Sequence, residues 1–163
     1  MDRDSRKTLV IENRLAELAR LERWLAGLLE QWGIKPETGF RVDLVINEAV
    51  TNVVRHAYPE DTTQTLSLSL TDTPGGVIIE IVDGGIPFNP FDAPEMASAR
   101  NLEEASIGGR GIHLMKAFAD DYDYSRVSGQ NRLTLVISKD TDPFEPHTLN
   151  ASRNLPSRRH FSR

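Results

Sequence analysis

The sequence predicts a two-layer α/β sandwich, in which helices cover one face of a mixed, mostly antiparallel sheet. Three observations lead to this fold class. Apolar residues recur at three- and four-residue spacing in two early segments, as they do in amphipathic helices. In later segments apolar and polar residues alternate, which is typical of half-buried strands. The expected order is strand, two helices, two strands, a long loop, a helix and two strands.

The first elements are one strand and two helices. Residues 7–11 (KTLVI) form a short β-branched run that predicts an edge strand. Leucine and tryptophan residues over 15–32 have helical spacing, and Gly33 suits the position just after a helix C-terminus. A second helix is expected over about 36–56, because proline is favoured in a first helical turn and another proline follows the segment closely.

The remaining elements are two pairs of strands and one helix. Residues 65–70 (TLSLSL) alternate strictly, and residues 77–83 (VIIEIVD) follow after the turn DTPGG, which predicts an antiparallel hairpin. Helical spacing returns over 112–119 (IHLMKAFA). Residues 121–127 and 131–138 then predict two further strands, joined by the turn SGQN.

Two segments lie outside these regular elements. A long stretch rich in Gly, Pro and Ala separates the first hairpin from the last helix. Loops of this length are uncommon in compact domains and are usually functional lids or disordered segments. Residues 140–163 are polar, end in a basic cluster and show no periodicity, so we expect a disordered or partner-dependent tail. Residues 1–139 then form the domain.

The bulk composition excludes several classes of protein. The chain has 163 residues, 39% of them hydrophobic, which suffices for one domain with a real core. The absence of cysteine excludes thiol catalysis and cysteine metal sites. A net charge of -5 argues against a general nucleic-acid binder, and no apolar run approaches the roughly 18 residues that cross a membrane. The N-terminus is not a secretory signal, so we expect a cytoplasmic protein.

The second helix carries two polar residues beside its apolar stripe. Glu48 and Asn52 are four positions apart, so they project from one helix face. Asparagine is a poor residue for a helix interior, so a functional role is open for this pair. The alternative is a boundary pair in which Asn52 bonds to neighbouring backbone.

Two glycine-rich motifs follow at the ends of predicted elements. Asp83 ends a strand and precedes two glycines, so its carboxylate could accept a hydrogen bond from a ligand amino group while Gly85 lets a flat ring approach. A plain Asp-Gly turn is the alternative. Residues 108–111 (GGRG) lie immediately before the last predicted helix, where exposed backbone N–H groups form a natural phosphate seat. The motif is neither a P-loop nor a dinucleotide fingerprint.

Taken in order, these motifs indicate a known family. The stretches that carry the similarity are NEAVTNVVRHAYPED, IVDGGIPFNP, GGRGIHLMKAFADDYDYS and NRLTLVISK. Together they resemble the Bergerat-fold ATPases, the superfamily of gyrase, the heat-shock chaperone and the histidine-kinase catalytic domains. Within that superfamily the chain is most similar to the anti-sigma-factor serine-protein kinases. The resemblance covers roughly residues 7–139 and implies the Bergerat ATP-binding fold.

The resemblance implies ATP and Mg²⁺ as cofactors and assigns roles on the second helix. Asn52 matches the magnesium ligand of the family, and an amide oxygen is a hard donor of the kind that Mg²⁺ accepts. Glu48 matches the general base that takes a proton from the acceptor hydroxyl.

The resemblance also implies a base pocket and a lid. Asp83 matches the carboxylate that binds the adenine amino group, and Gly85 keeps the space beside the ring open. Gly109 and Gly111 match the glycines that close over the phosphates, and the lid would be about residues 88–107.

One part of the glycine box departs from the family pattern. Many of these kinases carry an arginine just before it, where this chain has Ile107 and Gly108. Phosphoryl transfer depends on positioning and charge neutralisation, so this change concerns the rate of transfer more than ATP binding. Arg110 lies within the box and either contacts phosphate or is solvated.

The resemblance also implies partners. It favours a serine/threonine protein kinase that phosphorylates a STAS-type anti-anti-sigma protein, binds a sigma factor when that protein is absent, and forms a homodimer. The alternative is a partner-switching module in which ATP is mainly structural. A dimer-gated ATPase of the gyrase type is disfavoured, because such enzymes need a second domain that supplies a catalytic lysine.

Overall fold

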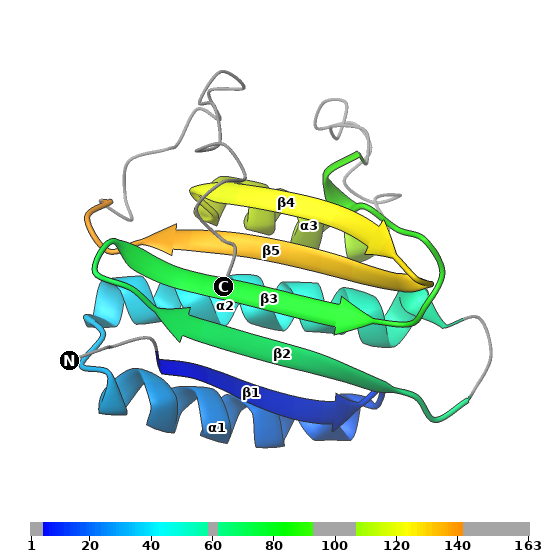
Figure 1. Cartoon of the computed structure of the whole chain (residues 1–163), viewed down its shortest axis with the longest axis horizontal. Helices are drawn as coiled ribbons and strands as arrows, with labels where there is room; N and C mark the ends of the chain where they lie inside the picture. Colours follow the sequence, from blue (N-terminus) through cyan, green and yellow to red (C-terminus); the bar gives the residue numbers. More distant parts are fainter. Residues whose placement is uncertain (1–4, 59–61, 93–106, 142–163) are drawn as a thin grey trace.

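The computed structural model describes residues 5–58, 62–92 and 107–141. These residues form one five-stranded sheet with strand order β1-β2-β3-β5-β4, and the helices lie together behind one face of that sheet (Figure 1). The strands are β1 (Ser5–Glu12), β2 (Thr65–Asp72), β3 (Gly76–Asp83), β4 (Asp121–Val127) and β5 (Gln130–Ser138). The helices are α1 (Leu18–Gln31), α2 (Pro36–Asn52) and α3 (Ile107–Phe118). The predicted two-layer α/β sandwich is confirmed.

The expected mixture of strand directions is wrong for the described residues, because every neighbouring pair of strands is antiparallel. The connection through α3 does return the chain to the same direction, so β3 and β4 run parallel. They are not neighbours, however, because β5 folds back between them and bonds to both. As predicted, β1 is an edge strand.

The core lies between the sheet and the helices. Alternate residues of each inner strand point toward the helices, and the three leucines of β2 are at most 1% exposed. The helices complete the core with apolar stripes at helical spacing. Its buried helical members include Leu21, Leu25, Leu28, Val42, Val45, Ile46 and Ala49. No helix in the described residues is long and apolar enough to cross a membrane.

The two helices nearest the candidate site have different limits from those predicted. The predicted helix over 36–56 ends as an α-helix at Asn52 and continues as a π-helical turn, η2, over Val53–Ala57. The last helix begins at Ile107 rather than at 112, so the glycine box forms its first turns instead of preceding it. Each glycine disfavours a helix by about 1 kcal/mol, which made the box look like loop, and packing against α2 offsets that penalty.

Two predicted segments fall mainly outside the described residues. Of the expected lid, residues 93–106 are not described, while the short 3₁₀ turn η3 (Pro90–Asp92) marks where the described part ends. Of the expected tail, residues 142–163 are not described. Neither prediction is tested.

Candidate functional site

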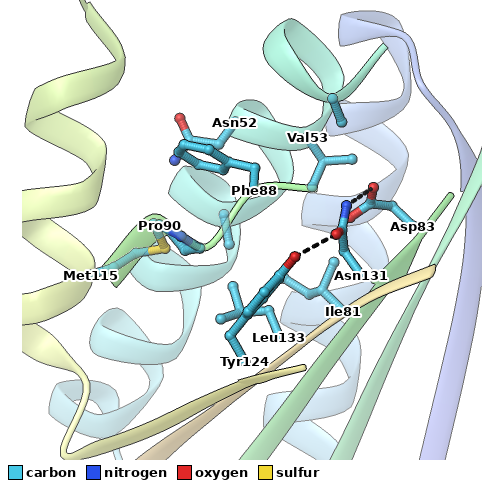
Figure 2. Close-up of a pocket in the computed structure, with 12 residues that line it drawn as sticks. Asn52, Val53, Ile81, Asp83, Phe88, Pro90, Met115, Tyr124, Asn131 and Leu133 are labelled. Carbon is cyan, nitrogen blue, oxygen red and sulfur yellow. Dashed lines mark hydrogen bonds between the residues drawn. The ribbon is translucent and has the colours of Figure 1, made fainter. Parts of the chain in front are cut away.

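A pocket opens at one end of the sandwich, between α2 with its π-helical turn, the strands β3, β5 and β4, and the segment that follows β3. The described residues that line it are Ala49, Asn52, Val53, Ala57, Ile81, Asp83, Phe88, Pro90, Met115, Tyr124, Asn131 and Leu133 (Figure 2). The enclosed volume is about 30 Å³, enough for a water molecule but not for a purine ring. Phe88 and Pro90, which follow β3, form part of the pocket wall.

The π-helical turn shapes one wall of this pocket. A π turn widens a helix, and such turns are frequent at functional sites. This one brings the carbonyl of Ala57 toward the loop after β3, where it accepts a hydrogen bond of 2.8 Å from the backbone N–H of Ile86. A Cβ on Gly85 would lie 2.5 Å from both the Cβ and the carbonyl oxygen of Ala57. Gly85 is therefore required for this close approach.

Glu48 and Asn52 lie on the side of α2 that meets α3. The amide nitrogen of Asn52 is buried and has no hydrogen-bond partner in the described part of the chain. A buried polar group without a partner is costly, and a ligand that completes its bonding is one explanation for it. One turn earlier, the carboxylate of Glu48 touches α3: a Cβ on Gly111 would lie 2.3 Å from its Oε2.

Asp83 lies at the end of β3 and is 5% exposed. Its Oδ1 accepts hydrogen bonds from the backbone N–H of Gly85 at 2.9 Å and from Nδ2 of Asn131 at 3.0 Å. Among the described residues no hydrogen bond reaches Oδ2. One carboxylate oxygen in the pocket wall is therefore fixed, and the other remains available as an acceptor.

Tyr58, which follows the π-helical turn, is hydrogen-bonded to the same loop. Its hydroxyl oxygen accepts a 3.2 Å hydrogen bond from the backbone N–H of Gly84. Burial raises the pKa of the Tyr58 phenol, and the nearby Asp83 carboxylate raises it further, against the opposing effect of the Gly84 hydrogen bond. The phenol therefore stays protonated at neutral pH and contributes no charge to the site.

Asn131 was missed by the sequence analysis. It lies on β5, is 4% exposed, and bonds to Asp83 and to the hydroxyl of Tyr124, as Figure 2 shows. A signal existed, because residues 131, 133, 135 and 137 share the buried face of the strand and only the first is polar. A polar residue at an inward position of an alternating strand is a reason to search for buried partners.

The structure brings some predicted site residues together and leaves others apart. Asn52 and Asp83 line one pocket, with Gly85 beside it. Gly111 instead contacts Glu48, and the backbone of Gly109 lies in the first turns of α3. The side chain of Arg110 is outside what the structure describes.

The polar groups suit Mg²⁺ only in combination with a ligand. No group of three or more His, Asp or Glu side chains that could hold a metal occurs in the described residues. Magnesium, however, commonly binds one or two protein oxygens, several waters and substrate phosphates. The amide oxygen of Asn52, which lines the pocket, is a donor of the kind that this mode of binding uses.

Comparison with known proteins agrees with this architecture. Residues 11–137 match the family described as the histidine kinase-like ATPase domain. The serine/threonine-protein kinase BtrW of Bordetella bronchiseptica is 33% identical over 122 residues, which are 75% of this chain and 79% of that protein. The serine-protein kinase RsbW of Bacillus subtilis is 25% identical over 120 residues, which are 71% of this chain and 72% of that protein.

Solved structures with a similar chain course include a histidine kinase domain from Erythrobacter litoralis, a blue-light activated kinase. The match has a TM-score of 0.45 and 19% sequence identity, and it covers 73% of this chain and 63% of that one.

Proposed function

The chain belongs to the histidine kinase-like ATPase domain family, among its serine-protein kinases, and on that premise we propose that it transfers the γ-phosphate of ATP to a STAS-type partner protein. The acceptor is a serine or threonine of an anti-anti-sigma protein in a partner-switching system. One observation carries the proposal: Asn52, with a partnerless amide nitrogen, and Asp83, with one carboxylate oxygen free of bonds among the described residues, line one pocket in a chain related to serine-protein kinases.

The adenine ring binds at the Asp83 end of this pocket. The 6-amino group of adenine donates to Oδ2 of Asp83, and Gly85 leaves room for the ring edge. The phosphates extend toward Asn52, Glu48 and the first turns of α3, which include Gly109, Arg110 and Gly111. Burial of Asp83 supports this arrangement, because a carboxylate in a dry pocket makes a stronger hydrogen bond than one in water.

The proposed metal ligand is Asn52, through its amide oxygen. When Mg²⁺ is bound, Asn52 would hold it through this oxygen, and the ion would supply charge neutralisation for the transferring phosphoryl group. Asn52 itself is held by α2 immediately before the π-helical turn, so its position is set by the helix and not by a mobile loop.

Glu48 acts as the general base. The hydroxyl oxygen of the acceptor attacks the γ-phosphorus, and the bond from that phosphorus to the bridging oxygen breaks. ADP leaves with the bonding electron pair, and the hydroxyl proton passes to the Glu48 carboxylate. Contact between Glu48 and Gly111 means that the first turns of α3 must shift, or that the second carboxylate oxygen accepts the proton.

A second function is supported by the same contact. If Glu48 stays covered by α3, the protein is an ATP-binding anti-sigma module in which ATP is mainly structural. The presence of Ile107 and Gly108, where many related kinases carry an arginine, favours this alternative. In both cases we propose that the chain forms a homodimer in the cytoplasm and binds a sigma factor.

The deciding experiment measures transfer of labelled phosphate from ATP to a purified STAS-domain protein. The wild type should label that protein, and Glu48→Gln should abolish labelling while ATP binding is retained. Glu37→Gln is the matched control, because Glu37 is an exposed glutamate on the same helix, and it should label normally. ATP binding without labelling by the wild type would replace the kinase proposal with the structural one.

A further inference from the structure

We propose that Asn131 is a positioning residue that makes the pocket select 6-aminopurines, and that Tyr124 and Arg126 hold it in place. This inference rests on the proposed binding of ATP at Asp83 and deepens it. It concerns the β4–β5 end of the pocket, for which the sequence motifs gave no role.

The carboxamide of Asn131 uses its full hydrogen-bonding capacity. Its Nδ2 donates to Oδ1 of Asp83 at 3.0 Å and to the carbonyl of Ile86 at 2.8 Å. Its Oδ1 accepts from the Tyr124 hydroxyl at 2.7 Å and from a guanidinium nitrogen of Arg126 at 2.8 Å. The residue is 4% exposed, so its polar atoms depend on partners inside the fold.

These partners allow only one orientation of the amide. If the amide were flipped, its oxygen would face Asp83 Oδ1 and the Ile86 carbonyl, which are both acceptors. Its NH₂ group would then face Arg126, which can only donate. The identity of the neighbours therefore determines that Asn131 donates to Asp83.

The hydrogen bond from Asn131 to Asp83 determines which oxygen of Asp83 is left to bind the purine base. Oδ1 receives both Asn131 and the Gly85 N–H, so Oδ2 is the remaining acceptor. A pure acceptor binds a ring that presents an amino group at C6, as adenine does. It repels a ring with a carbonyl at that position, as guanine has, because two acceptors then face each other in a dry site.

Arg126 provides a way to test the mechanism from outside the pocket. It is exposed, it is not among the cavity-lining residues, and its hydrogen bonds go to Asn131 and to the Gly85 carbonyl. Strand pairing places it directly opposite Asn131 across the β4–β5 hairpin. Any effect of Arg126 on base selection must therefore act through this network.

The experiment is calorimetric titration of the full chain with MgATP, MgGTP and the magnesium complex of purine riboside triphosphate, which lacks the 6-amino group. The wild type should prefer ATP over the other two by at least about tenfold. Asn131→Ala should weaken ATP binding by about tenfold, and Arg126→Ala by about threefold, as expected for loss of one hydrogen bond to a charged group. Neither should change the affinity for purine riboside triphosphate by more than about twofold.

Two further variants provide a rescue and a matched control. Asn131→Ser keeps one donor for Asp83 and should recover part of the lost ATP affinity. Asn47→Ala removes an amide whose hydrogen-bond partner among the described residues is Asp43, on the same helix, and it should leave all three affinities unchanged.

The outcomes separate this inference from the proposed function. If the wild type binds no ATP, the proposed function falls and this inference falls with it. If the wild type prefers ATP but the Asn131 and Arg126 variants lose ATP and purine riboside triphosphate equally, only the inference is overturned. Those residues then maintain the pocket as a whole. If Asn131→Ala fails to fold, Arg126→Ala still tests the inference, because Arg126 is exposed and acts on the same hydrogen bonds.

Discussion

Two buried polar clusters lie at opposite ends of β5. They differ in how many of their polar groups find hydrogen-bond partners within the protein. At the C-terminal end, Arg41 of α2 is 1% exposed and donates to the carbonyls of Ser138 and Phe118 at 3.1 and 3.0 Å. It also forms an ion pair of 2.5 Å with Asp120. The charge of Arg41 is thus matched inside the protein, which leaves only its Nε without a partner in the described residues.

At the N-terminal end of β5, the second cluster is left open toward a pocket. Asp83 keeps one carboxylate oxygen free of bonds among the described residues, and the Asn52 amide nitrogen is buried without a partner. Both residues line the pocket, whereas Arg41 and Asp120 do not. Burial and polarity alone therefore do not mark a site. A site is marked by hydrogen-bonding groups that have no partner in the protein and that a ligand can reach.

Asn52→Ala is expected to have the largest effect on function and little effect on stability. Phosphate transfer should fall by about a thousandfold, or about 4 kcal/mol in activation free energy, because the proposed metal loses its protein ligand. The free energy of unfolding should change by less than about 1 kcal/mol, since the lost amide has an unsatisfied nitrogen in the folded protein. Labelled-ATP assays and urea unfolding measure the two quantities. A large loss of stability would show that Asn52 belongs to a closed cluster.

Asp120→Ala should behave in the opposite way. It removes the carboxylate that faces a buried guanidinium, and the free energy of unfolding should fall by about 3 kcal/mol. The ATP dissociation constant, measured at a temperature where the variant is folded, should not change. Asp123→Ala is the control, since Asp123 is an exposed position on β4. Weaker ATP binding by folded Asp120→Ala would mean that the two ends of β5 are coupled.

Neighbouring glycines test how closely the π-helical turn approaches the pocket loop. Gly85→Ala should lower the free energy of unfolding and weaken ATP binding, because the new methyl group meets the backbone of Ala57. The two losses together should come to about 2 kcal/mol. Gly84→Ala should be neutral in both measurements, since the residue is exposed and a methyl group there would meet no other described atom within 4 Å. Thermal unfolding and calorimetric titration of the pair give the comparison. Equal behaviour of the two variants would contradict the close approach.

Much of the fold could be predicted because burial repeats with the period of each element. Alternation located the strands, and three- and four-residue spacing located the helices. Helical period also placed Glu48 and Asn52 on one face, while Asp83 was indicated by its place at a strand end. The start of α3 could not be predicted this way, because glycines carry no apolar period and their helical state depends on packing against α2.

The parts that the sequence did not reveal depend on contacts between distant segments. The π-helical turn is tied to the Ala57–Ile86 hydrogen bond, which joins residues far apart along the chain. Asn131 meets Asp83 only through the register of β3 against β5, and Arg126 through the register of β4 against β5. From the sequence alone, Arg41 looks like an exposed arginine on a helix, because its partner Asp120 lies 79 positions away along the chain.

The smallest expected effect on stability concerns Glu80. The arginines of its ion pairs are exposed to solvent, whereas Arg41 in the Arg41–Asp120 pair is buried. Glu80 bonds to Arg6 at 2.7 Å and to Arg132 at 2.8 Å, and both arginine side chains are about half exposed. Burial alone would raise the pKa of Glu80, but the two arginine hydrogen bonds outweigh it and hold the pKa below its ordinary value.

A lowered pKa in the folded state means that Glu80 contributes stability above the unfolded pKa and loses it as the pH falls through the folded pKa. The stability difference between wild type and Glu80→Gln should therefore be largest near neutral pH and shrink below about pH 4.5. Solvent screening limits it to less than about 1 kcal/mol, and added salt should reduce it further. Urea unfolding from pH 7 to about pH 3 tests this. A difference that grows with acidity would mean that Glu80 carries a raised pKa and that its arginines do not stabilise the charged form.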